Sequence, residues 1–540
     1  MNARVSPSAA GPVTVKEATL RLLRSLRMTT VFGNPGSTEL GFLHDWPDDF
    51  RYILGLQESI VVAMADGYAQ ATGMAAFVNL HSAAGLGHAL GSVYTAQRNQ
   101  TPLVITAGQQ TRDLLPLRPF LGATSASEFP RPYVKWSCEP ARAADVPLAI
   151  AQAHCIAMQK PCGPTFVSIP ADDWLQPAQF TPVLPKSRDF APDPASLRDV
   201  AAAINNSQWP LLVVGSAVAR DNATDLVVAL AERVQSPVWY APMMGRAAFP
   251  EGHPLFAGFL PAAPDPLYKI LAPHDVVLVL GAPAFTFHVS GNLSLAQSGP
   301  AVYQITDDAE AAATALAATS VLGTIRLATA ALLDHLTGKE APPAVGMRAA
   351  VKRREPVDPI PAGFVMQSIA DSRPSGSVIV EEAPSHKGAL QRHLPIHDTR
   401  FYAMASGGLG YALPAAVGIA LGGGARRIIC IVGDGSAMYS IQALWTAGRH
   451  KLPITYVILN NGGYAALRAF SQLTGAKDPP GIELEGLDFV ALAEGHGCSA
   501  RRVSRASELL PALREAFATP APTLIEVMVD RAIEPLFRTA

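Results

Sequence analysis

Short apolar runs alternate with helical patterns along almost the whole of this 540-residue chain. In its first part, the runs at residues 30–32, 52–54 and 77–80 are each followed by a helical pattern. Parallel strands need a long crossover connection, usually a helix, so this alternation predicts a parallel sheet covered by helices. We therefore expect an α/β fold.

Two segments rich in proline and polar residues divide the alternation into three parts. The first segment spans residues 182–194, and the second, which is also rich in charge, spans residues 340–361. A length of roughly 100–200 residues per domain also suggests about three domains. We expect three consecutive doubly wound parallel-sheet domains, at residues 13–182, 195–338 and 360–540.

The composition favours an enzyme that acts on small molecules. Hydrophobic residues make up 49% of the chain, charged residues 16%, and the formal net charge is −2. We find no basic stripe typical of nucleic-acid binding and no apolar run long enough to span a membrane. The five cysteines have no CxxC spacing, which argues against a disulfide framework or a zinc site. We expect a cytoplasmic protein without nucleic-acid or membrane partners.

The strongest chemical signal lies at the ends of two predicted strands in the third part. The strand at residues 428–432 is followed by GDGS, and the next predicted strand ends in NNGG. Ligands of open α/β sheets bind at the carboxyl ends of strands. Glycines let the backbone approach a diphosphate, and oxygen ligands suit Mg²⁺ or Ca²⁺. GDG alone is also common between a strand and a turn, but the pair is more specific. The residues of this anchor are Gly433, Asp434, Gly435, Ser436, Asn461 and Gly463.

Strand, GDGS, helix, strand and NNGG in this order resemble the signature of thiamine-diphosphate-dependent enzymes. The segment LQE at residues 56–58, followed by ADGYA in a helical pattern, matches that family's glutamate segment. The resemblance implies that Glu58 hydrogen-bonds the cofactor's pyrimidine ring and promotes loss of the thiazolium C2 proton. Without the resemblance, Glu58 in a first helical turn would merely complement the helix dipole.

The same resemblance implies pyrimidine-binding, middle and diphosphate-binding domains in that order. Gly407 would accept a hydrogen bond from the cofactor, and Leu409 would wedge it into a bent shape, although a leucine in a Gly-rich turn is also an ordinary core residue. The site would form between two subunits, so a homodimer is the minimum and a homotetramer is common. The remaining residues implied to bind the cofactor are Pro384, Ser385 and Tyr464, and the metal ligands are Asp434, Asn461 and the Gly463 carbonyl.

Within the family, long segments resemble the benzoylformate decarboxylases. They include VFGNPGSTEL at residues 31–40, FVNLHSAAGLGHALG at 77–91 and IVGDGSAMYSIQALWTA at 431–447. The resemblance implies that a 2-keto acid, benzoylformate or a related aromatic one, is converted to an aldehyde and CO₂, with carboligation as a side reaction. Two alternatives stay open: a carboligating transferase similar to acetolactate synthase, and an idle homologue that only binds the cofactor.

The likeness assigns roles to polar residues of the substrate pocket. Ser37 would bind the substrate carboxylate, and His81 and His288 would transfer protons. Each has a plainer interpretation, because Ser37 could cap a helix that starts at Thr38 and an isolated histidine is often structural. The apolar wall would comprise Leu121, Pro384, Ala466, Leu467 and Phe470, of which Leu467 and Phe470 could equally be ordinary core.

Two departures from the benzoylformate decarboxylase pattern affect this pocket. Pro384 replaces a hydroxyl residue and supplies neither a hydroxyl nor a backbone N–H. Gly463 stands where those enzymes have threonine, so we expect a roomier pocket around it. No feature of residues 195–340 demands a FAD-binding middle domain.

Overall fold

The computed structural model describes residues 13–293, 299–339, 351–424, 426–477 and 479–532. The chain divides into two compact units, the first ending at Ser187 and the second beginning at Arg188. None of the described helices combines the length and the apolar character that a membrane crossing requires.

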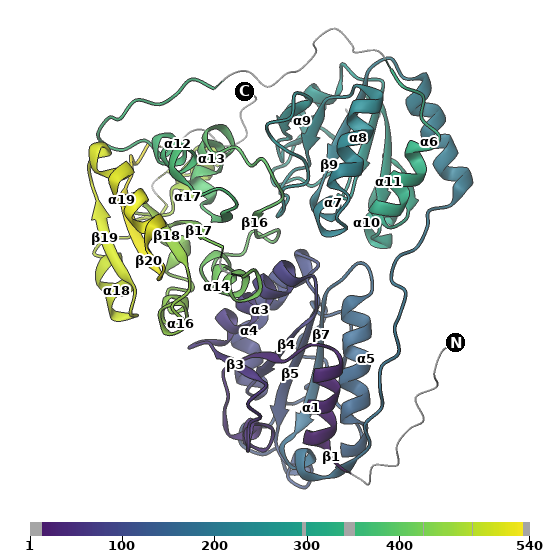
Figure 1. Ribbon diagram of the computed structural model, residues 1–540, viewed down its shortest axis with the longest axis vertical. Helices are drawn as coiled ribbons and strands as arrows, with labels where there is room; N and C mark the ends of the chain where they lie inside the picture. The colour runs from purple at the N-terminus through teal and green to yellow at the C-terminus, as the bar shows by residue number, and fades with distance from the viewer. Residues whose placement is uncertain (1–12, 294–298, 340–350, 425, 478, 533–540) are drawn as a thin grey trace. The chain divides into compact units, whose positions relative to one another are not determined.

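The first unit is built on a parallel sheet of six strands in the order β3-β2-β4-β5-β7-β6. Helices α1 (Val15–Ser25) and α5 (Val146–Met158) share an apolar core with one face of the sheet, and α3 (Glu58–Thr72) and α4 (Ser82–Arg98) pack together on the other (Figure 1). The strands are β2 (Thr30–Gly33), β3 (Arg51–Leu54), β4 (Ala76–Leu80), β5 (Leu103–Gln109), β6 (Ser137–Cys138) and β7 (Pro164–Pro170).

The second unit contains two further parallel sheets of six strands each. The earlier one has the order β11-β10-β9-β12-β13-β14, which is the strand order of dinucleotide-binding domains. Its strands are β9 (Pro210–Val214), β10 (Val238–Tyr240), β11 (Phe256–Phe259), β12 (Val276–Leu280), β13 (Ala301–Thr306) and β14 (Thr319–Leu322).

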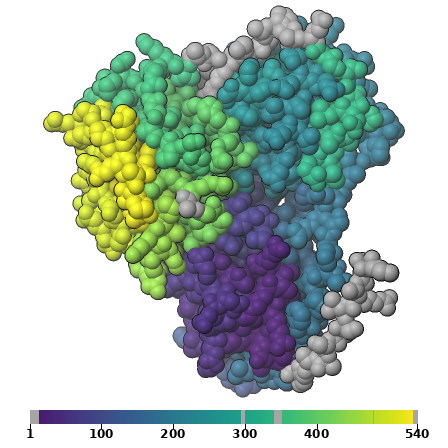
Figure 2. All heavy atoms as spheres, viewed as in Figure 1, coloured from purple at the N-terminus to yellow at the C-terminus, as the bar shows by residue number. Residues whose placement is uncertain are grey.

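The later sheet has the order β16-β15-β17-β18-β20-β19. Its edge strand β19 and the flanking helices α18 (Phe489–Gly495) and α19 (Ala506–Ala518) make the yellow surface in Figure 2. The strands are β15 (Val378–Glu382), β16 (Phe401–Ala403), β17 (Ile428–Gly433), β18 (Ile454–Asn460), β19 (Ser499–Val503) and β20 (Thr523–Met528).

The first and the last sheets share one topology, in which the second strand along the chain lies outside the first and the third lies on its other side. The connections therefore reverse direction between β2 and β4, and again between β15 and β17. Ligands of open α/β sheets bind at such switch points, at the carboxyl ends of the strands. The fold thus directs attention to the segments that follow these four strands.

The predicted α/β class with three parallel sheets is confirmed. The three domain ranges stay a prediction, since the two later sheets lie in one compact unit. The helix expected from Thr38 is wrong in detail: a 3-10 turn, η1 (Ser37–Glu39), precedes the four-residue helix α2 (Leu40–Leu43).

Candidate functional site

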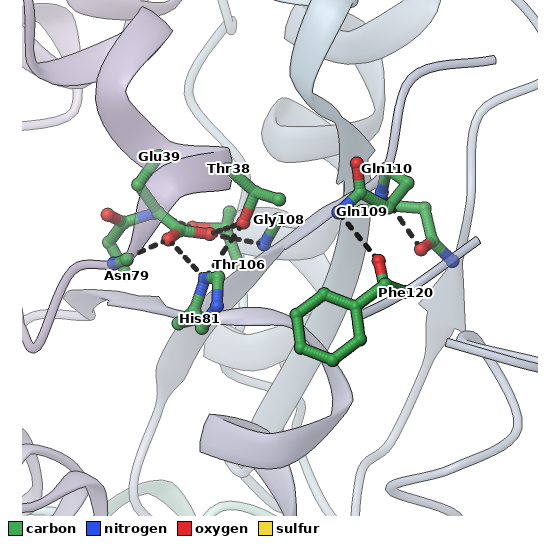
Figure 3. A network of polar contacts seen from close by, with 10 residues as sticks. Thr38, Glu39, Asn79, His81, Thr106, Gly108, Gln109, Gln110 and Phe120 are labelled. Atoms are coloured by element: carbon green, nitrogen blue, oxygen red, sulfur yellow. Dashed lines mark hydrogen bonds and ion pairs between the residues drawn. The ribbon is translucent and has the colours of Figure 1, made fainter. Parts of the chain in front are cut away.

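A buried carboxylate that the sequence did not single out joins the ends of β2, β4 and β5. Glu39 is 1% exposed. One oxygen, Oε2, accepts from the Gly36 N–H at 2.8 Å and lies 2.9 Å from His81 Nδ1. The other, Oε1, accepts from the Gly108 N–H at 2.9 Å and from the Thr38 hydroxyl at 2.6 Å (Figure 3). Four donors from three strand ends therefore converge on one side chain.

This carboxylate fixes the orientation of His81. Because a carboxylate oxygen accepts, Nδ1 of His81 carries the hydrogen and Nε2 is the nitrogen on the opposite side of the ring. Thr38 Oγ1 also lies 3.0 Å from Nδ1. The side chain of His81 is 18% exposed, so its ring is partly buried and still reaches solvent. Gly36 is the N-cap and has no side chain, so Glu39 supplies only the glutamate half of a capping box, through the Gly36 N–H.

We predict that Glu39→Ala lowers the free energy of unfolding of the protein by about 3 to 5 kcal/mol, because buried donors lose their acceptor. Chemical denaturation of both proteins measures the difference. Glu355→Ala, which truncates an exposed glutamate, is the matched control and should change stability by less than about 0.5 kcal/mol. Equal effects of the two substitutions would show that the Glu39 contacts do not support the fold.

Ser37 is the first residue of η1 and is exposed, and the N-cap of this turn is Gly36. The alternative that Ser37 caps the helix is therefore wrong. Leu121 lies in the left-handed region with φ 63°. The side chain of Gln110 donates to the Phe120 carbonyl at 2.9 Å (Figure 3). The side chain of Gln109 bonds both the N–H and the carbonyl of Ala123. The loop that carries Leu121 is thus tied to the end of β5.

Glu58 is the first residue of α3, where the Gln57 side chain caps the helix. Its side chain is 13% exposed, and Oε2 lies 3.2 Å from Nδ1 of the exposed His88 in α4. Gly85 allows this approach, since a Cβ at that position would lie 3.1 Å from Glu58 Oε1. The carboxylate is therefore mostly enclosed, with its helix and α4 on either side.

In the second unit, the two predicted anchor segments meet as expected. β17 and β18 are neighbours, and the buried Asp434 follows β17 directly. Its carboxylate accepts from the N–H of Gly435 and from the N–H of Gly463, both at 2.9 Å. Burial raises the pKa of Asp434. Asp434 thus ties the loop after β18 to the end of β17.

Asn461 and Asn460 have different surroundings. Asn460 donates to the buried Glu526 at 2.7 Å, and its oxygen accepts from the Gly462 N–H at 3.0 Å, so it holds the loop. Asn461 is 3% exposed, and its Nδ2 lies 3.1 Å from Nε2 of His386. Its Oδ1 is buried and has no hydrogen-bond partner among the described residues. A buried, unpartnered amide oxygen and a buried carboxylate, at the ends of neighbouring strands, fit a hard divalent cation.

His386 is a second buried side chain that the sequence did not single out. It closes the 3-10 turn η6 (Pro384–His386) after β15 and is 6% exposed. Burial lowers the pKa of His386 to about 4. The neighbouring Ser385 accepts from the Ala466 N–H at 2.9 Å, which joins this turn to α17 (Ala465–Thr474).

The expectation of extra room at Gly463 is wrong. Gly463 is buried, and a Cβ there would lie 2.4 Å from the Ile482 carbonyl oxygen and 2.9 Å from Nη2 of Arg468. The space that a side chain would need is already filled. The Tyr464 ring packs in a similar way on Gly435, where a Cβ would lie 2.4 Å from Cε1 of the ring. Of the two remaining anchor residues, Ser436 is buried and Gly433 is half-buried.

The Gly-rich turn that carries Leu409 is held by another buried carboxylate. Glu382, at the end of β15, is 1% exposed and accepts from the N–H groups of Gly410 and Ala412, both at 2.6 Å. Burial raises the pKa of Glu382 to about 8. Gly407 adopts a φ of 78°, which a side chain would strain. Glu382 therefore fixes the backbone that directly follows the half-buried Leu409.

His288 stacks on Phe470 with ring centroids 5.0 Å apart and an angle of 27° between the planes. His288 follows β12, whereas Phe470 belongs to α17. The buried residues of α17 are Ala465 and Ala469, so the alternative that Leu467 and Phe470 are ordinary core residues is wrong. The predicted pocket residues of this helix are Ala466, Leu467 and Phe470, with Leu467 51% exposed.

Family models of thiamine pyrophosphate (thiamine diphosphate) enzymes match all three parts of the chain. The N-terminal TPP binding domain matches residues 13–127, the central domain residues 197–332 and the C-terminal TPP binding domain residues 383–527. The chain belongs to the thiamine pyrophosphate enzyme family.

Within that family, the chain is more similar to benzoylformate decarboxylase than to the acetolactate synthases. It is 41% identical to the Pseudomonas aeruginosa benzoylformate decarboxylase over 97% of this chain and 100% of that one. A putative acetolactate synthase large subunit of Mycobacterium tuberculosis is 29% identical over 93% of this chain and 96% of its own length.

Solved structures give the same grouping. The benzoylformate decarboxylase of Polynucleobacter necessarius matches with a TM-score of 0.94 and 39% identity, over 97% of this chain and all of that one. The 4-hydroxybenzoylformate decarboxylase of Rhodococcus jostii matches with a TM-score of 0.92 and 38% identity, over 96% of this chain and all of that one.

Proposed function

We propose that this chain is a thiamine-diphosphate- and Mg²⁺-dependent carboxy-lyase that converts benzoylformate, or a related aromatic 2-keto acid, to an aldehyde and CO₂. The observation that carries the proposal is the unpartnered Asn461 oxygen, which follows the strand that neighbours the one delivering the buried Asp434 carboxylate, in a chain of this family. Ca²⁺ would suit the same oxygen ligands. The names of the similar enzymes support an aryl keto acid as the substrate.

Different residues of the chain would bind the metal and the parts of the cofactor. Asp434, Asn461 and the Gly463 carbonyl would hold the metal, while Gly435 and Ser436 would face the diphosphate. When bound, the cofactor supplies the carbanion chemistry that removes CO₂. Glu58 would hydrogen-bond its pyrimidine ring, with Gly407 and Leu409 shaping the cofactor. The rest of the cofactor site would be Gly433, Pro384, Ser385 and Tyr464.

The substrate would be bound and protonated by residues from several loops. The Ser37 hydroxyl would bind the keto acid carboxylate, and His81, oriented by Glu39, would present Nε2 for proton transfer. His288 would be the second proton carrier, and the ring of Phe470 would flank both it and the aryl group. Leu121, Pro384, Ala466 and Leu467 would complete the wall. The assembly would be at least a homodimer, and commonly a homotetramer.

A substrate panel tests the proposal. We expect purified full-length protein with thiamine diphosphate and Mg²⁺ to show a kcat/KM at least about tenfold higher for benzoylformate or 4-hydroxybenzoylformate than for pyruvate, because the side chains of Phe470 and Leu467 would favour a ring. Aldehyde and CO₂ are measured together. Acetolactate formed from pyruvate would favour the carboligating transferase instead. No activity with any keto acid would indicate a homologue that only binds the cofactor.

A further inference from the structure

His386 and Asn461 are in contact at the carboxyl edge of the sheet, although they follow two strands that are not neighbours. The strand order places β17 between β15 and β18. His386 follows β15, Asp434 follows β17 and Asn461 follows β18. The 3.1 Å contact between His386 Nε2 and Asn461 Nδ2 therefore spans the strand that delivers Asp434.

The chemistry of this contact has one direction. An amide nitrogen can only donate, so Nδ2 of Asn461 donates and Nε2 of His386 accepts. Both side chains are more than nine-tenths buried, and Asn461 Oδ1 is left without a partner among the described residues. With its NH₂ group held by the ring, the amide cannot exchange its oxygen and nitrogen without losing this bond.

We propose that His386 is a positioning residue that holds the Asn461 amide so that Oδ1, and not Nδ2, is presented to the divalent cation. The inference rests on the proposed function, because it assumes a cation between Asp434 and Asn461. The turn that carries the His386 ring is held at two points. The backbone N–H of His386 donates to the Ala383 carbonyl at 2.8 Å, and the side chain of the adjoining Ser385 accepts from the Ala466 N–H. Removal of a residue that hydrogen-bonds a metal ligand commonly lowers the metal affinity by about 10- to 100-fold.

The test is a Mg²⁺ titration of full-length protein freed of metal by chelation, at a saturating concentration of thiamine diphosphate. Binding is followed by intrinsic fluorescence and by the shift in Tm, without turnover. His386→Leu removes the acceptor, whereas His386→Gln keeps one in its side-chain oxygen. We expect His386→Leu to raise the dissociation constant for Mg²⁺ by about 10- to 100-fold and His386→Gln to raise it less. His386→Ala takes the place of His386→Leu if the latter does not fold.

Two further proteins separate the outcomes. Asn461→Ala should lose Mg²⁺ binding, and wild-type protein should bind it. If wild type and Asn461→Ala differ but the variants without the acceptor bind Mg²⁺ as wild type does, the role of His386 is refuted and the proposed function stands. If wild-type protein shows no response to Mg²⁺, the proposed function and the role of His386 fall together. An equal loss in His386→Gln and His386→Leu would also count against the hydrogen bond as the cause.

Discussion

Glu58→Ala is expected to reduce kcat/KM for benzoylformate by about 10²- to 10⁴-fold, the range that positioned acid–base groups contribute. The carboxylate is 13% exposed at the start of α3, so its loss removes a mostly enclosed acceptor rather than a core side chain. Steady-state kinetics with saturating cofactor and Mg²⁺ measures the effect.

The same variant should leave Mg²⁺ binding largely intact, because the proposed metal ligands belong to the second unit. Glu58→Gln keeps the size of the side chain and separates the loss of the carboxylate from a change in packing. His88→Ala, which removes the exposed partner of Glu58, is the control and should retain most of the activity. Full activity of Glu58→Ala would exclude this residue from cofactor activation.

Asp434→Ala is expected to abolish retention of both Mg²⁺ and thiamine diphosphate, with the dissociation constant for Mg²⁺ rising by at least about 100-fold. The carboxylate is the charged ligand of the proposed site and also joins the loops after β17 and β18 through Gly435 and Gly463. Equilibrium dialysis with Mg²⁺ and the cofactor measures the loss.

Asp434→Asn is the more informative partner of this variant, because it keeps the shape and removes the charge. Asp371→Asn, at an exposed aspartate paired with Arg353 in the same unit, is the matched control and should bind both ligands normally. Undiminished binding in Asp434→Asn and Asp434→Ala would place the metal elsewhere.

Local patterns were enough to predict the fold class and the anchor. The strand at 428–432 and GDGS are contiguous in sequence, and their geometry depends mainly on a buried strand that turns into a loop. The same holds for Glu58, which follows β3 and opens α3. Short edge strands such as β6 and β19 were not predicted, since few of their residues are apolar and buried.

The residues that the sequence did not reveal act through contacts between distant segments. Glu39 meets His81 and Gly108, which lie 42 and 69 positions away. His386 meets Asn461 across 75 positions. No local period brings such pairs together; the order of strands in the sheet does.

At Gly463, the sequence predicted a space that the structure does not contain. Comparison with a threonine suggested a vacant space, but the Ile482 carbonyl and the Arg468 side chain occupy it. A smaller residue enlarges a pocket only where its neighbours stay in place, and here the backbone of another segment has closed in. Substrate preference must therefore be sought in other residues, such as Phe470 and Pro384.

The dependence of the reaction on both ligands is measured as aldehyde formation from benzoylformate by metal-free, cofactor-free protein, with thiamine diphosphate and Mg²⁺ added back singly and together. We expect benzaldehyde and CO₂ in equal amounts only when both are present, and none when either is omitted. Decarboxylation without the cofactor, or no benzaldehyde with both present, would contradict the proposed function.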